Sequence, residues 1–154
     1  MTDWFSEWFD SRYYHILYKN RDQQEAESFL KNLSKLELFK KNSKIIDIAC
    51  GKGRHSLFLS ELGYDVTGVD LSKNSIKHAK QFEKENLKFD VADMRKTYKK
   101  NSFDISLNLF TSFGYFKNKE NDFSAIKSMS ENLKKDGILI IDFLNSKKVI
   151  DNLV

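Results

Sequence analysis

The 154-residue sequence contains no proline, one cysteine and no long hydrophobic run. Because no proline-rich or low-complexity linker interrupts it, we expect a single domain over residues 1–154. The lone Cys50 excludes an internal disulfide and is typical of a protein of the reducing cytoplasm. The longest apolar stretch, residues 138–144, contains Asp142 and is too short to cross a bilayer, and no signal peptide is recognisable. We therefore expect a cytoplasmic protein without a membrane partner.

The sequence also lacks a dense basic block, although its formal net charge is +4. The lysines occur singly or in pairs, such as Lys40-Lys41 and Lys134-Lys135. A nucleic-acid interface gathers basic side chains on one face, so this spacing favours an ordinary solvated surface. We do not expect nucleic acid as a partner, and we predict no metal site.

Aromatic residues, by contrast, are concentrated in residues 1–20, at spacings typical of a short helix. Two interpretations remain open for this aromatic-rich segment. It packs against the core, or it forms a lid over a ligand that Tyr14, Tyr18 or Arg21 touches. Residues 1–41 are accordingly predicted to be a helical lid or packing segment that precedes the core.

Residues 44–144 alternate between strand-like and helix-like patterns. We expect strands at residues 44–49, 64–70, 87–91, 103–110 and 138–143. We expect one helix at residues 23–39, which begins in a capping box at 22–25, and another at residues 54–62. A third helix should follow an N-cap at Ser72, and a fourth should run from about Phe123 to Gly137, which ends it. Strands that alternate with helices predict an α/β fold with a parallel sheet and right-handed crossovers.

Residues able to bind a ligand follow the first two strands, at the sheet edge where parallel sheets hold their ligands. Gly51 and Gly53 allow the backbone to approach a ligand without a Cβ in the way. Asp70 ends the second strand, where its carboxylate can accept both hydroxyls of a ribose.

The third strand adds groups suited to a purine. Asp93 can accept a hydrogen bond from an exocyclic amine, and the Met94 amide can donate to a ring nitrogen. Leu71 and Met94 are apolar neighbours that can sandwich the ring. Each acid alone also suits a helix or turn cap, but their alignment at one sheet edge predicts an adenosine site.

Three residues around the glycines narrow the choice of adenosine compound. A dinucleotide fingerprint needs a third glycine where this chain has Ser56, and a P-loop needs Ser or Thr where Gly53 follows Lys52. Asp47, just before the glycines, would repel a phosphate but suits a ligand that carries an ammonium and a sulfonium. These features indicate S-adenosylmethionine.

Five segments together resemble the class I S-adenosylmethionine-dependent methyltransferases. The first segment, residues 47–53, is similar to that family's acid-x-x-x-Gly-x-Gly signature. The resemblance as a whole covers about residues 44–144. Details of the third and fourth segments resemble a small-molecule branch of the family. The matching segments are residues 47–53, 69–72, 91–95, 103–116 and 133–137.

The resemblance implies a Rossmann-like doubly wound sheet in the order 3-2-1-4-5, with helices on both faces and an N-terminal helical aromatic-rich segment. It implies S-adenosylmethionine as cofactor, S-adenosylhomocysteine as product and a small-molecule acceptor. The implied cofactor-binding residues are Asp47, Ala49, Cys50, Gly51, Gly53, Asp70, Leu71, Ala92, Asp93, Met94 and Leu109. The candidates for the acceptor site are Tyr14, Tyr18, Phe113 and Tyr115.

The family's sheet has seven strands, whereas this sequence supplies five before Val154. We therefore expect a chain truncated after its fifth strand, with the C-terminal strands missing and an apolar sheet edge exposed. A homodimer through this edge or through the N-terminal aromatic residues is the oligomer we consider.

The predicted reaction is in-line attack by an acceptor atom on the sulfonium methyl group, for which the protein supplies mainly positioning. A base is needed only for a protonated acceptor, and we assign none among His15, Tyr14, Tyr115 and Asp142. One alternative is a non-catalytic S-adenosylmethionine-binding module that needs a partner or the missing part. A less favoured one is an NAD-binding domain.

Overall fold

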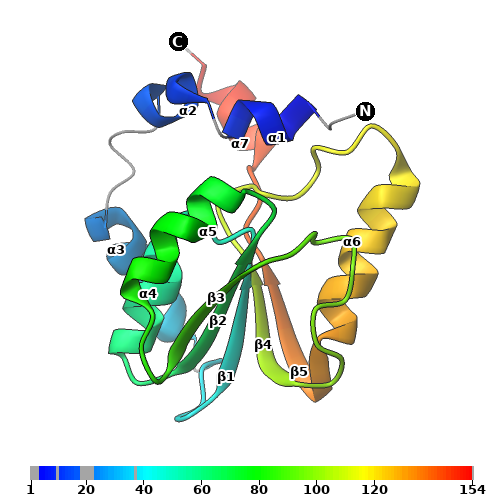
Figure 1. The fold of residues 1–154 in the computed structure, drawn as a ribbon. Helices are drawn as coiled ribbons and strands as arrows, with labels where there is room; N and C mark the ends of the chain where they lie inside the picture. The colour runs from blue at the N-terminus through cyan, green and yellow to red at the C-terminus, as the bar shows by residue number, and fades with distance from the viewer. Residues whose placement is uncertain (1–3, 10, 18–22, 37, 154) are drawn as a thin grey trace.

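The computed structural model describes residues 4–9, 11–17, 23–36 and 38–153 of the chain (Figure 1). Five parallel strands form one sheet in the order β3-β2-β1-β4-β5, which confirms the predicted Rossmann-like topology. The strands are β1 (Lys44–Ile48), β2 (Asp65–Asp70), β3 (Leu87–Val91), β4 (Phe103–Asn108) and β5 (Leu133–Ile141). The α-helices are α1 (Trp4–Phe9), α2 (Arg12–Leu17), α3 (Gln23–Ser34), α4 (Arg54–Glu61), α5 (Lys73–Ala79), α6 (Lys119–Glu131) and α7 (Ser146–Asp151), and a short 3-10 helix, η1 (Lys80–Phe82), follows α5.

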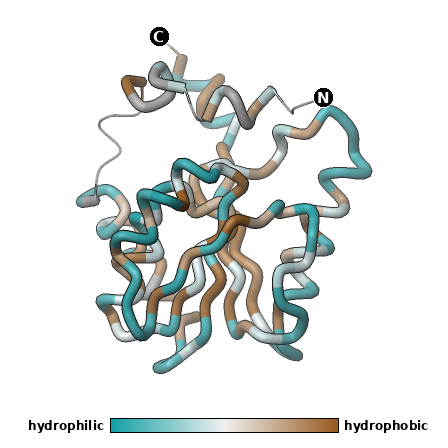
Figure 2. The backbone as a smooth tube through the Cα atoms, viewed as in Figure 1, coloured by the Kyte–Doolittle hydropathy of each residue, from teal (hydrophilic) through white to brown (hydrophobic). Residues whose placement is uncertain are grey.

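Helices cover both faces of the sheet, so it is doubly wound. On one face Leu30 of α3, Leu59 of α4 and Ile76 of α5 pack in a single hydrophobic cluster with the strands. On the other face Ala125 and Met129 of α6 belong to a second cluster. Figure 2 shows the hydrophobic stretches following the strands, between the more polar helices. The winding reverses between β1 and β4, and ligands of such sheets bind beyond the strand ends at this point.

Helix α5 begins where the sequence predicts. The Ser72 side chain accepts a hydrogen bond from the Ser75 amide at 3.0 Å, as an N-cap residue does. Helix α3, in contrast, ends at Ser34 instead of residue 39. Leu36 is 62% exposed, so little apolar burial supports a further helical turn there. Part of the predicted capping box, residue 22, lies outside the described residues.

The prediction that Gly137 ends the helix that begins near Phe123 is wrong. Helix α6 ends at Glu131, and β5 begins at Leu133, five residues earlier than expected. Phe103 pairs with Leu133 but Ile105 pairs with Ile138, so residues 134–137 form an irregularity inside the strand. Asp136 takes a left-handed backbone there (φ 64°), which allows the chain to rejoin the sheet.

Strand β4 also differs from its prediction, because it ends at Asn108 instead of residue 110. Phe110 and Thr111 adopt left-handed backbone angles, with φ of 60° and 54°, and these end the extended strand. The aromatic-rich N-terminus forms two short helices, α1 and α2, which lie above the carboxyl ends of the strands together with α7 (Figure 1). Among the described residues, no helix is long and apolar enough to traverse a bilayer.

Candidate functional site

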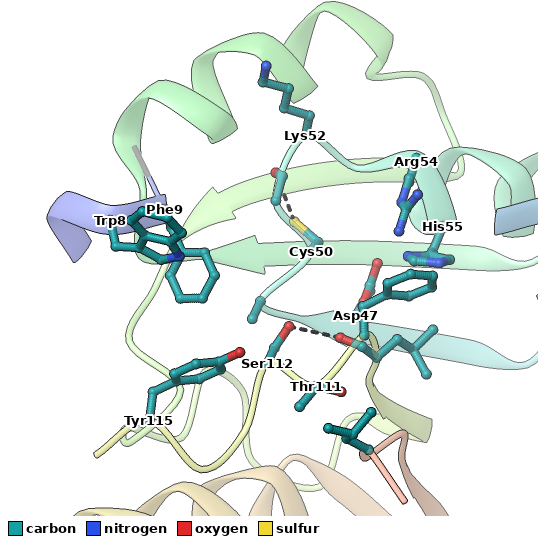
Figure 3. Close-up of a pocket in the computed structure, with 15 residues that line it drawn as sticks. Trp8, Phe9, Asp47, Cys50, Lys52, Arg54, His55, Thr111, Ser112 and Tyr115 are labelled. Carbon is teal, nitrogen blue, oxygen red and sulfur yellow. Dashed lines mark hydrogen bonds between the residues drawn. The ribbon is translucent and has the colours of Figure 1, made fainter. Parts of the chain in front are cut away.

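Two adjoining cavities open at the carboxyl ends of the strands. The first, of about 390 Å³, lies over β1, the start of α4 and the loop after β4 (Figure 3). The second, of about 470 Å³, lies over the ends of β2 and β3. The residues that line both are Phe9, Ala49, Gly51, Ser112 and Tyr115. One elongated ligand could therefore occupy both cavities.

The two glycines after β1 have different roles. Both are left-handed, with φ of 57° at Gly51 and 83° at Gly53. A Cβ on Gly51 would meet no atom within 4 Å and would enter the space where the cavities join. A Cβ on Gly53 would lie 2.5 Å from the Phe89 ring, and Gly53 is not among the described residues that line either cavity. Gly51 thus leaves room for a ligand, whereas Gly53 leaves room for packing.

Asp47 of β1 is 1% exposed and lines the first cavity. Its Oδ2 accepts a 2.6 Å hydrogen bond from the Ser56 hydroxyl of α4. Burial raises the pKa of Asp47 to about 6, and the negative charge of Asp70 adds to the effect. A ligand cation near this carboxylate would restore its charged form.

Asp70, at the end of β2, is held in place by two backbone amides. Gly51 N donates to its Oδ2 and Ser72 N donates to its Oδ1, each at 2.8 Å. These bonds fix a carboxylate on the wall of the second cavity. A carboxylate oxygen can accept more than one hydrogen bond, so Asp70 can still receive ligand hydroxyls.

Asp93 lines the same cavity but already has a strong partner that the sequence did not reveal. The Arg95 guanidinium contacts the Asp93 carboxylate, with Nη2 2.6 Å from Oδ2. Partial burial raises the pKa of Asp93, but the bonds from Arg95 outweigh it and leave the pKa below its usual value. Arg95 also lies over the Phe116 ring, at 5.1 Å from its centroid. The ion pair fixes the Asp93 carboxylate and occupies part of its accepting capacity.

His55 and Cys50 line the first cavity without being suited to acid–base or nucleophilic chemistry at neutral pH. Burial lowers the pKa of His55 to about 3, with Arg54 adding to the effect, so the imidazole is neutral. Burial raises the pKa of the Cys50 thiol well above its usual value. Arg54 itself donates to Glu25 at 3.2 Å and stacks on Phe110, 4.2 Å from the ring centroid.

Helix α1 covers the cavities. Phe9 lines both cavities, Trp8 lines the first and Phe5 lines the second. The helix is held by ring contacts to the loop after β4: Phe9 and Trp4 lie 5.3 and 5.9 Å from Tyr115. Figure 3 shows Trp8, Phe9 and Tyr115 on the side of the first cavity away from Arg54 and His55. These contacts fit both interpretations of the N-terminal segment, because α1 packs on the loop after β4 and also borders the cavities, so α1 as a lid stays a prediction.

All the predicted cofactor residues except Gly53 line a cavity. Asp47, Cys50 and Leu109 line the first, Ala49 and Gly51 line both, and the second is lined by Asp70, Leu71, Ala92, Asp93 and Met94. Ala49 takes a left-handed conformation (φ 61°) that an alanine rarely adopts.

The predicted acceptor residues are less well supported. Tyr115 lines both cavities, but Phe113 packs against the second hydrophobic cluster. Tyr18 and Arg21 lie outside the described residues, as do the side chains of Tyr14 and His15. The sequence pointed to Trp8, Phe9 and Thr111 only as members of the aromatic-rich segment and of the loop after the fourth strand, because no motif marks any of them individually. In the described part of the chain, no three or more His, Cys, Asp or Glu side chains gather where they could hold a metal ion.

Comparison with known proteins agrees with this geometry. Residues 39–153 match a family described as a methyltransferase domain. A putative methyltransferase of Bacillus subtilis, YqeM, is 35% identical over 111 residues, which span 70% of this chain and 45% of that protein. The dTDP-3-amino-3,4,6-trideoxy-alpha-D-glucopyranose N,N-dimethyltransferase of Streptomyces venezuelae is 31% identical over 101 residues, or 65% of this chain and 42% of that one. The chain thus spans less than half the length of these relatives.

The fold also has close structural counterparts. The crystal structure of Streptomyces venezuelae DesVI superposes with a TM-score of 0.71 at 25% identity, over 85% of this chain and 56% of that one.

Proposed function

This chain belongs to the class I S-adenosylmethionine-dependent methyltransferases, and from that membership we propose that it transfers a methyl group from S-adenosylmethionine to a small-molecule acceptor. Because the chain spans less than half the length of the curated relatives above, the activity of the whole protein is part of the proposal. The cofactor would lie across both cavities and supply an activated methyl group on a sulfonium.

The second cavity suits the adenosine part. Asp70, fixed by two amides, would accept the ribose hydroxyls. Leu71 and Met94 offer apolar surface for the purine faces, and both line this cavity. Asp93 would accept a hydrogen bond from the adenine amine at the acceptor positions of its carboxylate that Arg95 does not occupy.

The first cavity suits the methionine part. The buried Asp47 carboxylate favours a cationic ligand, as the ammonium and sulfonium groups require. Gly51 leaves open the space between this carboxylate and Asp70, with Ala49, Cys50 and Leu109 beside it. Gly53 would act indirectly, by allowing α4 to pack closely on Phe89.

The acceptor would enter beside Thr111, Tyr115 and α1. This wall of the first cavity is aromatic and closed by the lid, which suits a small molecule more than a polymer. The Streptomyces venezuelae relative is named as an N,N-dimethyltransferase of an amino sugar nucleotide, and a small acceptor is proposed here by analogy. No base is assigned, because His55 is neutral and is not basic enough to take up a proton at neutral pH.

One observation carries the proposal: two adjoining cavities share Gly51, and each presents a buried or amide-fixed carboxylate, Asp47 in one and Asp70 in the other. A phosphate-binding site would not place carboxylates on both sides of its glycine turn.

The proposal is tested by measuring S-adenosylhomocysteine release while a panel of amines, hydroxy compounds and thiols is offered as acceptors. We expect release that depends on one acceptor class and is abolished in Asp70→Ala. Binding of S-adenosylmethionine without release for any acceptor would favour a non-catalytic binding module, and binding of NADH instead would overturn the proposal.

A further inference from the structure

The loop after β4 contains two consecutive non-glycine residues in a left-handed conformation, Phe110 (φ 60°) and Thr111 (φ 54°). Such a conformation costs about 1–2 kcal/mol for each residue with a side chain. Backbone strain of this kind persists only where surrounding contacts hold it, and it is common at functional sites. The residues that hold this loop are therefore of interest.

Asp142, which follows β5, holds both strained residues. Its Oδ2 accepts the Phe110 amide at 3.0 Å, and its backbone carbonyl accepts the Thr111 amide at 3.1 Å. Its own amide donates to the Asn108 carbonyl at 2.9 Å, so Asp142 is itself aligned by the end of β4. The next residue, Phe143, lies where a Cβ on Gly114 would meet its ring at 3.2 Å.

The loop that Asp142 holds forms one wall of the functional site. Phe110, Thr111 and Ser112 line the first cavity, and Tyr115 lines both cavities and contacts α1. A change in the backbone of Phe110 and Thr111 would therefore move this wall and the support of the lid together.

We propose that Asp142 is a positioning residue, whose side-chain oxygen holds the strained Phe110–Thr111 turn and thereby shapes the wall of the methyl-transfer cavity. The proposal deepens the function above and rests on it. What Asp142 contributes is a hydrogen-bond acceptor at the right distance from the Phe110 amide, and neither its charge nor proton transfer is required. Asparagine can make the same bond, whereas glutamate keeps the charge but displaces the oxygen.

The test measures the affinity of purified wild-type and variant chains for S-adenosylhomocysteine by calorimetry. We expect Asp142→Asn to bind within about twofold of wild type and Asp142→Glu to bind about tenfold more weakly, as loss of one well-placed hydrogen bond predicts. Thr111→Gly accepts the left-handed backbone without strain, so adding it to Asp142→Glu should recover part of the loss.

A matched control lies at the opposite ends of the same strands. Asp104 of β4 accepts the Lys44 amide at 2.8 Å, and Asp104→Glu disturbs this bond far from the cavities. We expect this variant to lose stability without losing affinity. If Asp142→Glu binds as tightly as Asp142→Asn, the positioning role is wrong while the proposed function stands. A wild-type chain that binds no S-adenosylhomocysteine overturns both.

Discussion

Asp47, which we propose binds the cationic part of the cofactor, also carries a cost to folding. Its carboxylate is 1% exposed, and burial raises its pKa to about 6 from the 3.8 of a free side chain. The folded chain therefore binds a proton more tightly than the unfolded chain, and stability falls as the pH rises from about 4 through about 6. Above this range the buried charge costs about 3 kcal/mol of stability.

The substitution Asp47→Asn should separate these two effects. The amide keeps an acceptor for Ser56 and removes the charge, so at pH 7 the variant should be more stable than wild type by up to about 3 kcal/mol. The gain should disappear towards pH 4, where Asp47 is protonated. Denaturant titrations of both chains between pH 4 and pH 7 measure this difference in the free energy of unfolding. A gain that is equal at all pH values would show that it does not come from the charge of Asp47.

The same variant should bind S-adenosylmethionine at least tenfold more weakly at pH 7, because the cation loses its carboxylate. Calorimetric titration of the two chains checks this. If the variant is stabilised and still binds S-adenosylmethionine with wild-type affinity, Asp47 does not contact the cofactor.

Gly51 and Gly53 provide a matched pair for a second prediction. Both are left-handed, so alanine at either position costs about 1–2 kcal/mol of stability. At Gly53 the Cβ would also clash with the Phe89 ring, and this overpacking should lower the free energy of unfolding by about a further 1–3 kcal/mol. At Gly51 the Cβ meets no protein atom and enters the cavity, so Gly51→Ala should chiefly lower cofactor affinity.

Chemical denaturation and calorimetry of the two alanine variants distinguish these roles. Gly53→Ala should show the larger loss of stability, and Gly51→Ala the larger loss of affinity per unit of stability lost. The reverse ordering would show that Gly53, and not Gly51, faces the ligand.

At the scale of secondary-structure elements, α1 depends on the loop after β4 for its position. Tyr115 lies within 6 Å of two α1 rings, Phe9 and Trp4, measured between centroids. Each aromatic pair contributes about 0.5–1.5 kcal/mol beyond the area it buries. If α1 is the predicted lid, these two pairs hold it with about 1–3 kcal/mol, and we expect it to open for ligand exchange.

Tyr115→Ala should loosen this lid. Losing two aromatic pairs predicts cofactor dissociation faster by about tenfold or more, with little change in the rest of the fold. Stopped-flow displacement of a fluorescent cofactor analogue measures the rate. Tyr64→Ala is the control, since it removes a ring contact to Phe39 at the other end of the strands, and it should leave dissociation unchanged.

The sequence predicted the order and type of the core elements but not all their limits. Apolar runs and glycine turns mark buried strands and tight connections well, as at β1 and Gly51. The end of α6 was missed because Gly137 resembles a helix terminator, whereas residues 134–137 in fact form an irregularity in β5. A register shift depends on how two strands pair, and the sequence of one strand alone does not predict this pairing.

For the site, the sequence identified side chains that follow strand ends and missed those that act through contacts. Asp70 was predicted from its place after β2, and the structure adds the two amides that fix it. The pairing of Asp93 with Arg95, and of Asp142 with the Phe110 amide, depends on side-chain direction and loop strain. Neither leaves a period or motif in the sequence.

At the scale of the whole molecule, the sheet has two outer edges, formed by β3 and β5. The outer edge of β3 is covered locally, since Glu83 accepts the Phe89 amide and Asp90 accepts the Val91 amide. These bonds protect β3 from pairing with another strand. The homodimer, through the β5 edge or through the N-terminal aromatic residues, remains a prediction, and analytical ultracentrifugation across a range of concentrations would test it.

We propose that the two cavities together hold one molecule of S-adenosylmethionine, with its cationic part beside Asp47. Calorimetric titration of the wild-type chain with S-adenosylmethionine at pH 7 and pH 5, with NADH as the comparison ligand, tests it most directly. We expect one site per chain, an affinity about tenfold weaker at pH 5 because Asp47 takes up a proton, and no NADH binding. Binding of NADH in place of S-adenosylmethionine, or an affinity that does not change between the two pH values, would contradict it.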